Sequence, residues 1–271
     1  MKQKIAVDLG GTNMRVALMK GNKIFKYTKK QTPNNKNAIL KLLIKSILEI
    51  DNKSVKGIGV AFGGPVERGV VRNVPNISLN NFNLRKYLQD KFKKRVVIEN
   101  DANCVALAEA KLGCKKKNFI ILTLGTGIGG GIIIEGRLYK GQGYAGELGH
   151  IILHNDKDFE ELVASKRQRN LTKQYFGKSL MIQELIKINN NKSKKILDEI
   201  AKYLGQGIGS LINVFDPEVV ILAGGIKDSG NKFLSMIKKQ AQEYVFIPRK
   251  TEIKWTKLTY PGVLGAGLLV N

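Results

Sequence analysis

The chain has 271 residues, of which 43% are hydrophobic, and this length allows one large α/β domain or two lobes with buried cores. No apolar run reaches the roughly 18 residues of a membrane-spanning helix, and the first residues lack a signal-peptide pattern. The two cysteines lack metal-ligand spacing. We therefore expect a cytoplasmic protein with reduced thiols and no membrane contact. The formal net charge of +24 lies in short scattered clusters without interleaved aromatic residues, which argues against a specific nucleic-acid partner but should help to attract an anionic nucleotide.

The first part of the chain alternates the patterns of strands and helices, as in α/β proteins. Apolar runs that end in glycine or polar turns predict strands, and apolar residues at helical spacing predict helices. The predicted strands are 4–10, 14–30 with a turn at Gly21-Asn22, 55–64 and 95–101, and the predicted helices are 37–50, 82–92 and 101–113.

After a polar break at 114–118, the second part begins again with a strand, a glycine turn and a strand. The predicted strands are 119–127, 128–141, 217–225 and 253–258. Helical patterns fill about 158–190 and 194–213, and further helices are predicted at 233–244 and 262–270. We therefore expect a small N-terminal lobe over 1–116, completed by the C-terminal helix 262–271, and a large C-terminal lobe over 117–261.

Three glycine turns follow predicted strands: DLGGTN at 8–13, TLGTGIGGG at 123–131 and ILAGGI at 221–226. Bare backbone N–H groups and a threonine hydroxyl at such turns suit the oxygens of a phosphate group. The carboxylate of Asp8 can hold Mg²⁺ through water, because Mg²⁺ keeps much of its hydration. The turns therefore predict a nucleotide site.

The second turn resembles other nucleotide motifs only superficially. Gly125, Gly127 and Gly130 match GxGxxG, but they lead into a strand, whereas the glycines of a dinucleotide-binding unit open a helix. The chain has no GxxxxGK[ST] segment and no VAIK-, HRD- or DFG-like segment. The sequence thus argues against a Rossmann domain, a P-loop and a protein kinase.

Asn100 and Asp101 open the predicted helix 101–113 at the end of a strand. An aspartate at that place is by default the N-cap of the helix. The alternative, which we favour, is that Asp101 is a general base that receives the proton of an acceptor hydroxyl during phosphoryl transfer. Asp101 can have both roles only if the backbone, and not its side chain, satisfies the cap.

The segments DLGGTNMR, ENDANCVALAE, LTLGTGIGGG, GELGH and FDPEVVILAGG occur in this order, and on them the chain resembles the ROK family of sugar kinases and repressors over nearly its whole length. The resemblance implies an α/β, two-lobed actin-like ATPase fold of the hexokinase and ribonuclease H type, with a nucleotide and sugar cleft between the lobes. ROK repressors carry an N-terminal helix-turn-helix, and this chain starts at its first strand, so it is more similar to the kinase branch.

The resemblance also assigns roles to residues, with Asp101 as the catalytic base. The implied nucleotide- and phosphate-binding residues are Asp8, Gly10, Gly11, Thr12, Asn13, Arg15, Gly125, Thr126, Gly127, Gly129, Gly224 and Gly225. The implied sugar-binding residues are Gly64, Asn76, Asn100, Asp101, Glu147, His150 and Glu161. Asn76 follows a proline, so it is equally well explained as a turn residue.

The segment after GELGH departs from the family pattern. Most ROK proteins have a Cys-x-Cys-Gly-x-x-Gly-Cys segment there, whose cysteines hold a structural zinc together with the histidine, but this chain has no cysteine after Cys114. Three interpretations compete: a metal site of Glu147, His150 and His154, a surface loop, or a sugar pocket, which the resemblance favours. We expect no zinc, and the sequence leaves open what holds Glu161 in place.

The resemblance implies ATP-dependent phosphorylation of a hexose, with glucose as the preferred substrate and its 6-hydroxyl as the acceptor. Mg²⁺ would accompany ATP. Kinases of fructose, N-acetylmannosamine or N-acetylglucosamine remain alternatives, as does a polyphosphate-dependent glucokinase, which the positive charge favours. A sugar-sensing regulator is the non-enzyme alternative, and the presence of Asp101 and both phosphate turns argues against it. Dimers are common in the family, so a homodimer is compatible with the resemblance.

Overall fold

The computed structural model describes residues 3–72 and 77–270 of the chain. The chain divides into two compact units. The first contains Met1–Lys115, Leu138–Ala145 and Leu258–Asn271, and the second contains Lys116–Arg137 and Gly146–Lys257. No helix within the described ranges is both long and apolar enough to cross a bilayer.

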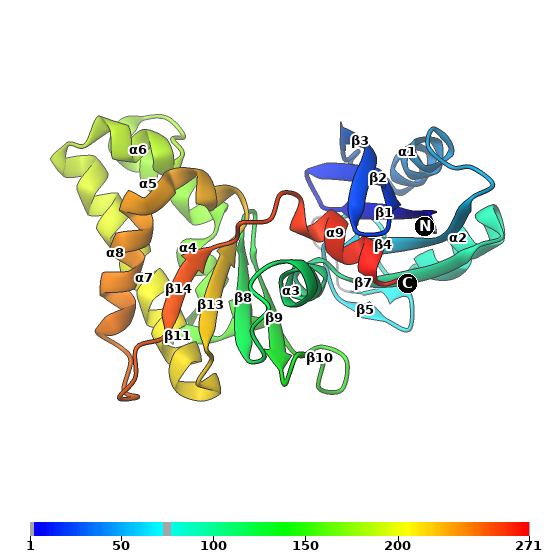
Figure 1. Cartoon of the computed structure of the whole chain (residues 1–271). Helices are drawn as coiled ribbons and strands as arrows, with labels where there is room; N and C mark the ends of the chain where they lie inside the picture. Colours follow the sequence, from blue (N-terminus) through cyan, green and yellow to red (C-terminus); the bar gives the residue numbers. More distant parts are fainter. Residues whose placement is uncertain (1–2, 73–76, 271) are drawn as a thin grey trace. The chain divides into compact units, whose positions relative to one another are not determined.

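The first unit is built on a five-stranded sheet with the order β3-β2-β1-β4-β7 (Figure 1). β1 pairs antiparallel with β2 and parallel with β4, and β4 pairs parallel with β7. The elements of this unit are β1 Gln3–Leu9, β2 Asn13–Lys20, β3 Lys23–Gln31, α1 Lys36–Leu48, β4 Val55–Phe62, β5 Val66–Glu67, β6 Val70–Val71, α2 Leu84–Phe92, β7 Arg95–Asn100, α3 Asp101–Leu112 and α9 Pro261–Leu268. The predicted strands and helices of this part are confirmed, apart from small shifts at their ends and the unpredicted hairpin β5–β6.

Successive residues of β1 pack against two different cores, because side chains of a strand point alternately to its two faces. Ile5 and Val7 belong to the larger core, to which α1 and α2 also contribute. Ala6, between them, belongs to a smaller core with Cys104 of α3 and Ala266 of α9. Helices therefore cover both faces of this sheet, as its parallel strands require.

The core under α9 is made of small residues because the helix backbone comes very close to the sheet. A Cβ atom added to Gly59 of β4 would lie 1.8 Å from the carbonyl oxygen of Ala266 in α9. Such an approach admits only glycine at that strand position. The C-terminal helix is thereby packed directly on β1 and β4.

The second unit is built on a sheet in which β9, β8, β13 and β14 are neighbours in this order, and β10 continues it beyond β9. β8 runs parallel to β13 and antiparallel to β9, and β13 runs parallel to β14. The elements are β8 Phe119–Leu124, β9 Ile128–Ile134, β10 Arg137–Tyr139, the 3₁₀ helix η1 Leu148–His150, β11 Ile152–His154, β12 Lys157–Asp158, α4 Phe159–Val163, α5 Ser165–Phe176, α6 Ile182–Ile188, α7 Asn191–Phe215, β13 Val219–Ala223, the 3₁₀ helix η2 Gly225–Ser229, α8 Gly230–Gln242 and β14 Glu252–Trp255.

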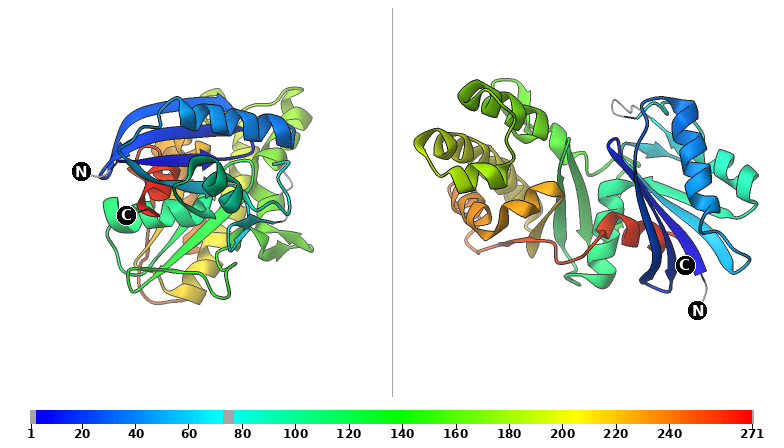
Figure 2. Two further views of the ribbon diagram at one scale, coloured as in Figure 1. Left: turned by 90° about the vertical axis from the view of Figure 1, so that its right-hand side faces the viewer. Right: turned by 90° about the horizontal axis from the view of Figure 1, so that it is seen from above.

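α7 is the helix that forms most of the core of the second unit. Its buried residues include Ile196, Ile200, Leu204, Ile208 and Leu211, a spacing of three or four that places them on one face. They pack in one cluster with apolar residues of β8, β9, β13 and β14. Figures 1 and 2 show α8 beside α7, and the two helices are in contact.

The helical pattern expected over about 158–190 is divided among three helices. α4 ends at Val163, Ala164 is extended with ψ of 165°, and α5 begins at Ser165. A loop then separates α5 from α6. The apolar spacing continues through these interruptions, so periodicity alone did not reveal them.

Candidate active site

Three groups of predicted site residues lie at one edge of the sheet in the first unit. Asp8 lies near the end of β1, Gly64 follows β4, and Asp101 follows β7. Because β1, β4 and β7 are parallel and adjacent, their carboxyl ends meet at the same edge, which is where α/β sheets bind ligands. The topology thus brings these residues together although they are far apart in the sequence.

The first glycine turn connects β1 with β2 and is held by hydrogen bonds from Thr32, which follows β3. The N–H of Gly10 donates to the carbonyl of Asn13 over 3.1 Å. The hydroxyl of Thr32 donates to the carbonyl of Gly10 over 2.7 Å, and the N–H of Thr32 donates to the carbonyl of Thr12 over 3.0 Å. Gly11 and Thr12 are exposed. The turn is therefore held rigid and accessible to a ligand, and Thr32 is a supporting residue that the sequence did not indicate.

Asp8 and Arg15 form an ion pair across β1 and β2, where they are register partners. Arg15 Nη1 donates to Asp8 Oδ2 over 2.9 Å. Burial raises the pKa of Asp8, and the nearby guanidinium of Arg15 opposes that rise. Arg15 thus helps to keep a desolvated carboxylate ionised at the start of the turn.

Asn100, and not Asp101, is the N-cap of α3. Asn100 Oδ1 accepts a hydrogen bond from the N–H of Asn103 over 3.1 Å, and Asn100 Nδ2 donates to the carbonyl of Gly64 over 3.3 Å. Asp101 is the first helical residue, and its Oδ1 accepts from the N–H of Ala102 over 2.8 Å. The default interpretation of Asp101 as the cap is therefore wrong, because the residue before it fills that role.

Glu99 organises the junction between β7 and α3. It is only 8% exposed, and its Oε1 accepts from the N–H of Asn100 over 3.0 Å and from Asn103 Nδ2 over 3.1 Å. Its Oε2 accepts from Lys140 Nζ over 2.7 Å. The ion pair between Glu99 and Lys140 links the segment Leu138–Ala145 to the strand end that carries Asp101.

The pKa of the Cys104 thiol indicates that several carboxylates lie near the start of α3. Burial raises its pKa well above the usual value, and the negative charges of Glu99, Asp101 and Asp8 raise it further. All three carboxylates therefore lie near the same turn of the helix. The ammonium group of Lys140 partly offsets these charges, and the region suits the binding of a hydroxyl-rich ligand or of a cation.

In the second unit, the turn between β8 and β9 is held by the start of two helices. The hydroxyl of Ser165 in α5 donates to the carbonyl of Gly125 over 2.5 Å. The N–H of Ile128, directly after the turn, donates to Glu160 Oε2 of α4 over 2.7 Å. Gly125 and Thr126 are exposed. The predicted passage of this turn into a strand is confirmed by β9.

The glycine turn after β13 requires its first glycine. Gly224 has φ of 97° and ψ of −177°, a region that is essentially restricted to glycine. A Cβ atom at this position would also lie 2.2 Å from the carbonyl oxygen of Leu124, whereas one at Gly225 would meet nothing within 4 Å. The turn after β13 thus lies directly against the end of β8, where the second phosphate turn begins.

The GELGH segment forms a charged group with α4. Partial desolvation raises the pKa of Glu147, Glu160 raises it further, and His150 lowers it. The pKa of His150 is raised, first by its hydrogen bond with Asp158 and then by the charges of Asp158, Glu160 and Glu147. The structure therefore brings Glu160, which the sequence did not single out, beside Glu147 and His150.

Glu161 has a defined place at the start of α4. Its Oε2 accepts from the N–H of Asp158 over 3.1 Å, and its own N–H donates to Asp158 Oδ1 over 2.7 Å, which is a capping box. The other oxygen of Asp158, Oδ2, lies 2.9 Å from His150 Nδ1. Asp158 thus contacts two residues that the sequence had assigned to a sugar pocket.

The metal interpretation of this segment finds no support in the described ranges. Within them, no three or more side chains of histidine, cysteine, aspartate or glutamate are arranged to hold a metal ion. The ring of His154 packs against Tyr203, with 5.8 Å between ring centres, while His150 contacts Asp158. Asn76 lies outside the described residues, so its predicted role stays a prediction.

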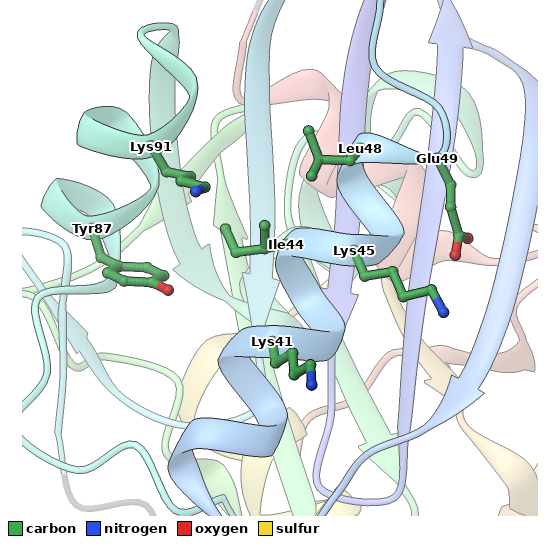
Figure 3. A pocket seen from close by; sticks show the side chains of 7 residues that line it. All are labelled: Lys41, Ile44, Lys45, Leu48, Glu49, Tyr87 and Lys91. Atoms are coloured by element: carbon green, nitrogen blue, oxygen red, sulfur yellow. The ribbon is translucent and has the colours of Figure 1, made fainter.

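A pocket of about 600 Å³ lies elsewhere in the first unit, between α1 and α2. Figure 3 shows Tyr87 and Lys91 of α2 projecting towards α1. The lining residues are Lys41, Ile44, Lys45, Leu48, Glu49, Tyr87 and Lys91. Glu49 is already paired with Lys30, over 2.8 Å. None of the predicted site residues lines this pocket, so it is separate from the candidate active site.

Comparison with known proteins identifies similar sequences and structures over nearly the whole chain. The model of the ROK family matches residues 4–271. A glucokinase of Halalkalibacterium halodurans is 27% identical, over 98% of this chain and 94% of that protein. A xylose repressor of Caldicellulosiruptor bescii is 29% identical, over 92% of this chain and 72% of the repressor.

The same similarity is found in three dimensions. The crystal structure of a ROK family glucokinase from Streptomyces griseus, in complex with glucose and AMPPNP, matches with a TM-score of 0.89 and 25% identity, over 99% of each chain. That neighbour has the two-lobed actin-like ATPase fold. The predicted fold class of this chain is therefore confirmed.

Proposed function

The chain belongs to the ROK family and is a sugar kinase, and from this premise we propose that it transfers the γ-phosphoryl group of ATP to the 6-hydroxyl of a hexose, preferably glucose. The observation that carries the proposal is the junction of β7 and α3. There Asn100 caps the helix, so the carboxylate of Asp101 is not required as the cap. A fixed carboxylate among polar groups at the carboxyl edge of a parallel sheet suits a general base.

Asp101 would receive the proton of the attacking hydroxyl. Phosphoryl transfer depends mainly on positioning and electrostatic stabilisation, and the protein has to supply few covalent steps. The amide of Asn100 is engaged by Asn103 and Gly64, so we assign it first to holding Asp101 and Gly64 in place. Its predicted contact with sugar hydroxyls would use the lone pairs and the second amide hydrogen that these bonds leave.

The nucleotide would be bound by the glycine turns. Gly11 and Thr12 of the first turn are exposed, as are Gly125 and Thr126 of the second, and each turn offers backbone N–H groups and a hydroxyl for phosphate oxygens. The turn at Gly224 and Gly225 offers bare backbone, which suits close approach of the adenosine. Asn13 and Gly129 would support these turns from the adjoining strands, and Gly127 from within the second turn.

The residues at the first turn fit a magnesium ion that arrives with the nucleotide. Asp8 is the single carboxylate of DLGGTN, it is largely desolvated, and one of its oxygens is held by Arg15. Mg²⁺ typically binds one or two carboxylates, keeps several waters and takes its other ligands from phosphates. Asp8 would hold the ion through water, and the bound ion would neutralise charge on the phosphates.

The sugar ring would be bound on the second unit by Glu147 and His150. The two residues are three positions apart in GELGH, and the charge of each shifts the pKa of the other. Carboxylates accept and imidazole donates hydrogen bonds, and sugar hydroxyls can do both. Glu160 lies in the same charged group, and we add it to Glu161 as a candidate contact.

A coupled assay tests this proposal directly. The purified protein would be supplied with glucose, fructose, mannose, N-acetylglucosamine or N-acetylmannosamine, each with ATP, ADP or polyphosphate as phosphate donor. We expect turnover with ATP and the highest kcat/KM with glucose. Phosphorylation of none of these sugars, together with specific binding of one of them, would instead support a sugar-sensing regulator, which the similarity to a xylose repressor makes the second candidate.

Replacing Glu147 with glutamine is expected to raise the KM for the sugar about 10- to 100-fold, because one charge-assisted hydrogen bond to a hydroxyl is lost. The KM for ATP should change less than threefold. Steady-state kinetics over both substrates measures the two values. Glu243→Gln, at the exposed end of α8, removes the same charge and should leave both values unchanged; an equal rise of both KM values in Glu147→Gln would contradict the assignment.

A further inference from the structure

Asp158 lies between two residues of the proposed sugar pocket and contacts both. We propose that Asp158 is a positioning residue that fixes the side chains of His150 and Glu161 relative to each other, and that it does so without a metal ion. The inference rests on the proposed function only in naming a sugar as the ligand of these side chains. The contacts themselves are independent of it.

The first contact orients the imidazole ring. Asp158 Oδ2 lies 2.9 Å from His150 Nδ1, and the Asp158 side chain is 18% exposed whereas that of His150 is 59% exposed. A carboxylate beside Nδ1 accepts a hydrogen bond from its N–H, which keeps the proton on that nitrogen and fixes the orientation of the ring. The other ring nitrogen, Nε2, is then left to meet a hydroxyl.

The second contact orients Glu161 and uses the other oxygen of Asp158. Asp158 Oδ1 accepts from the N–H of Glu161 over 2.7 Å, and the N–H of Asp158 donates to Glu161 Oε2 over 3.1 Å. These two bonds fix the first turn of α4 and the rotamer of the Glu161 side chain. Asp158 therefore joins η1 to α4 through two hydrogen bonds of its carboxylate and one of its backbone N–H.

Asp158 is itself anchored through the next residue. Phe159 is fully buried, and its N–H donates to the carbonyl of Ile151 over 2.9 Å. The intervening hairpin consists of β11 and β12, which have three and two residues and an irregular register. So short a hairpin contributes little rigidity of its own. The fixed relation of His150 to Glu161 is therefore best explained by Asp158 and its buried neighbour.

Asp158→Ser and Asp158→Ala separate the two contacts. Serine followed three residues later by glutamate is a capping box, so Asp158→Ser keeps the bond to the Glu161 N–H but is too short to reach His150. Asp158→Ala loses both bonds of the carboxylate and keeps only the backbone N–H that donates to Glu161. Asp156→Asn is the matched control, because Asp156 is exposed in the same hairpin with φ of 58°, which asparagine tolerates.

We expect both Asp158 variants to raise the KM for the sugar about tenfold, as for one lost charge-assisted hydrogen bond. The KM for ATP should stay within twofold, and thermal unfolding should show that Asp158→Ser recovers stability that Asp158→Ala loses. Asp156→Asn should behave as wild type. A wild-type sugar KM in both Asp158 variants, or an equal rise of both KM values in Asp158→Ser, would overturn the positioning role.

Nuclear magnetic resonance provides a readout that needs no activity, since the chain has only two histidines. The groups that face His150 are Asp158, Glu147 and Glu160. In Asp158→Ser we expect the pKa of His150 to fall, because its hydrogen bond with Asp158 is the largest cause that raises it. An unchanged His150 pKa would overturn the contact itself. This result stands even if the protein phosphorylates no sugar, so the two proposals fail separately.

The metal-free part of the inference has its own test. Wild-type protein would be dialysed against EDTA, and sugar binding would be measured by calorimetry without nucleotide. We expect the same affinity before and after dialysis. A loss of sugar affinity that added Zn²⁺ restores would overturn it.

Discussion

Replacing Asp101 with asparagine is expected to lower kcat by about 10²- to 10⁴-fold, the usual contribution of a general base. Asparagine has the same shape, and its amide oxygen can still accept the 2.8 Å hydrogen bond from the N–H of Ala102. The cap of α3 is unaffected because Asn100 provides it. The protein should therefore stay folded and bind sugar, and only proton transfer should be lost. Initial-rate kinetics and sugar calorimetry measure the two properties.

The matched control for that variant is Asp90→Asn in α2. Asp90 is exposed and pairs with Lys86 in the same helix, over 3.2 Å, so the loss of its charge should leave kcat unchanged. A near-wild-type kcat in Asp101→Asn would show that another group receives the proton. Loss of sugar affinity equal to the loss of kcat would instead assign Asp101 to binding.

Replacing Gly224 with alanine is expected to destabilise the protein by about 2–6 kcal/mol, the sum of a strained backbone and overpacking. The backbone at Gly224 has φ of 97°, and the added Cβ would lie 2.2 Å from the carbonyl oxygen of Leu124. That atom belongs to the backbone at the end of β8, so the neighbour cannot rotate away. Urea denaturation of wild type and variant measures the change in the free energy of unfolding.

Gly225→Ala is the control, because it adds the same methyl group one residue later. A Cβ at Gly225 meets no atom within 4 Å, so its unfolding free energy should match that of wild type within about 1 kcal/mol. The comparison separates the effect of the Gly224 conformation on stability from the effect of replacing any glycine with alanine. Equal stability of the two variants would contradict the conformation found at Gly224.

Much of the architecture can be predicted from the sequence because strands and glycine turns are local patterns. The strand at 4–10 and its turn, the helix at 101–113, and the turn that passes into β9 all agree with the structure. Helix boundaries after Asp158 could not be predicted, since the apolar spacing continues across Ala164 while the backbone there is extended.

The order of the motifs also led to the ROK family, which the family comparison confirms. The order of the motifs does not determine which sugar is bound or which side chains bind it. Both depend on where side chains point when distant segments pack, and specificity among sugars depends on pocket shape and on polar groups left unpaired. These assignments therefore stay predictions until the variants are measured.

The sequence by itself determined the α/β class, the order of the glycine turns and the place of Asp101 at the start of a helix, because each depends on residues that are neighbours in the chain. The two-lobed fold was implied by the resemblance of the motifs to the ROK family. Only the tertiary structure decided that Asn100 caps α3, that Lys140 holds Glu99 from forty-one residues away, and that Asp158 joins His150 to Glu161. The physical reason is that a hydrogen bond depends on distances of about 3 Å. Such distances are set by the packing of whole elements and leave no periodic trace in the sequence.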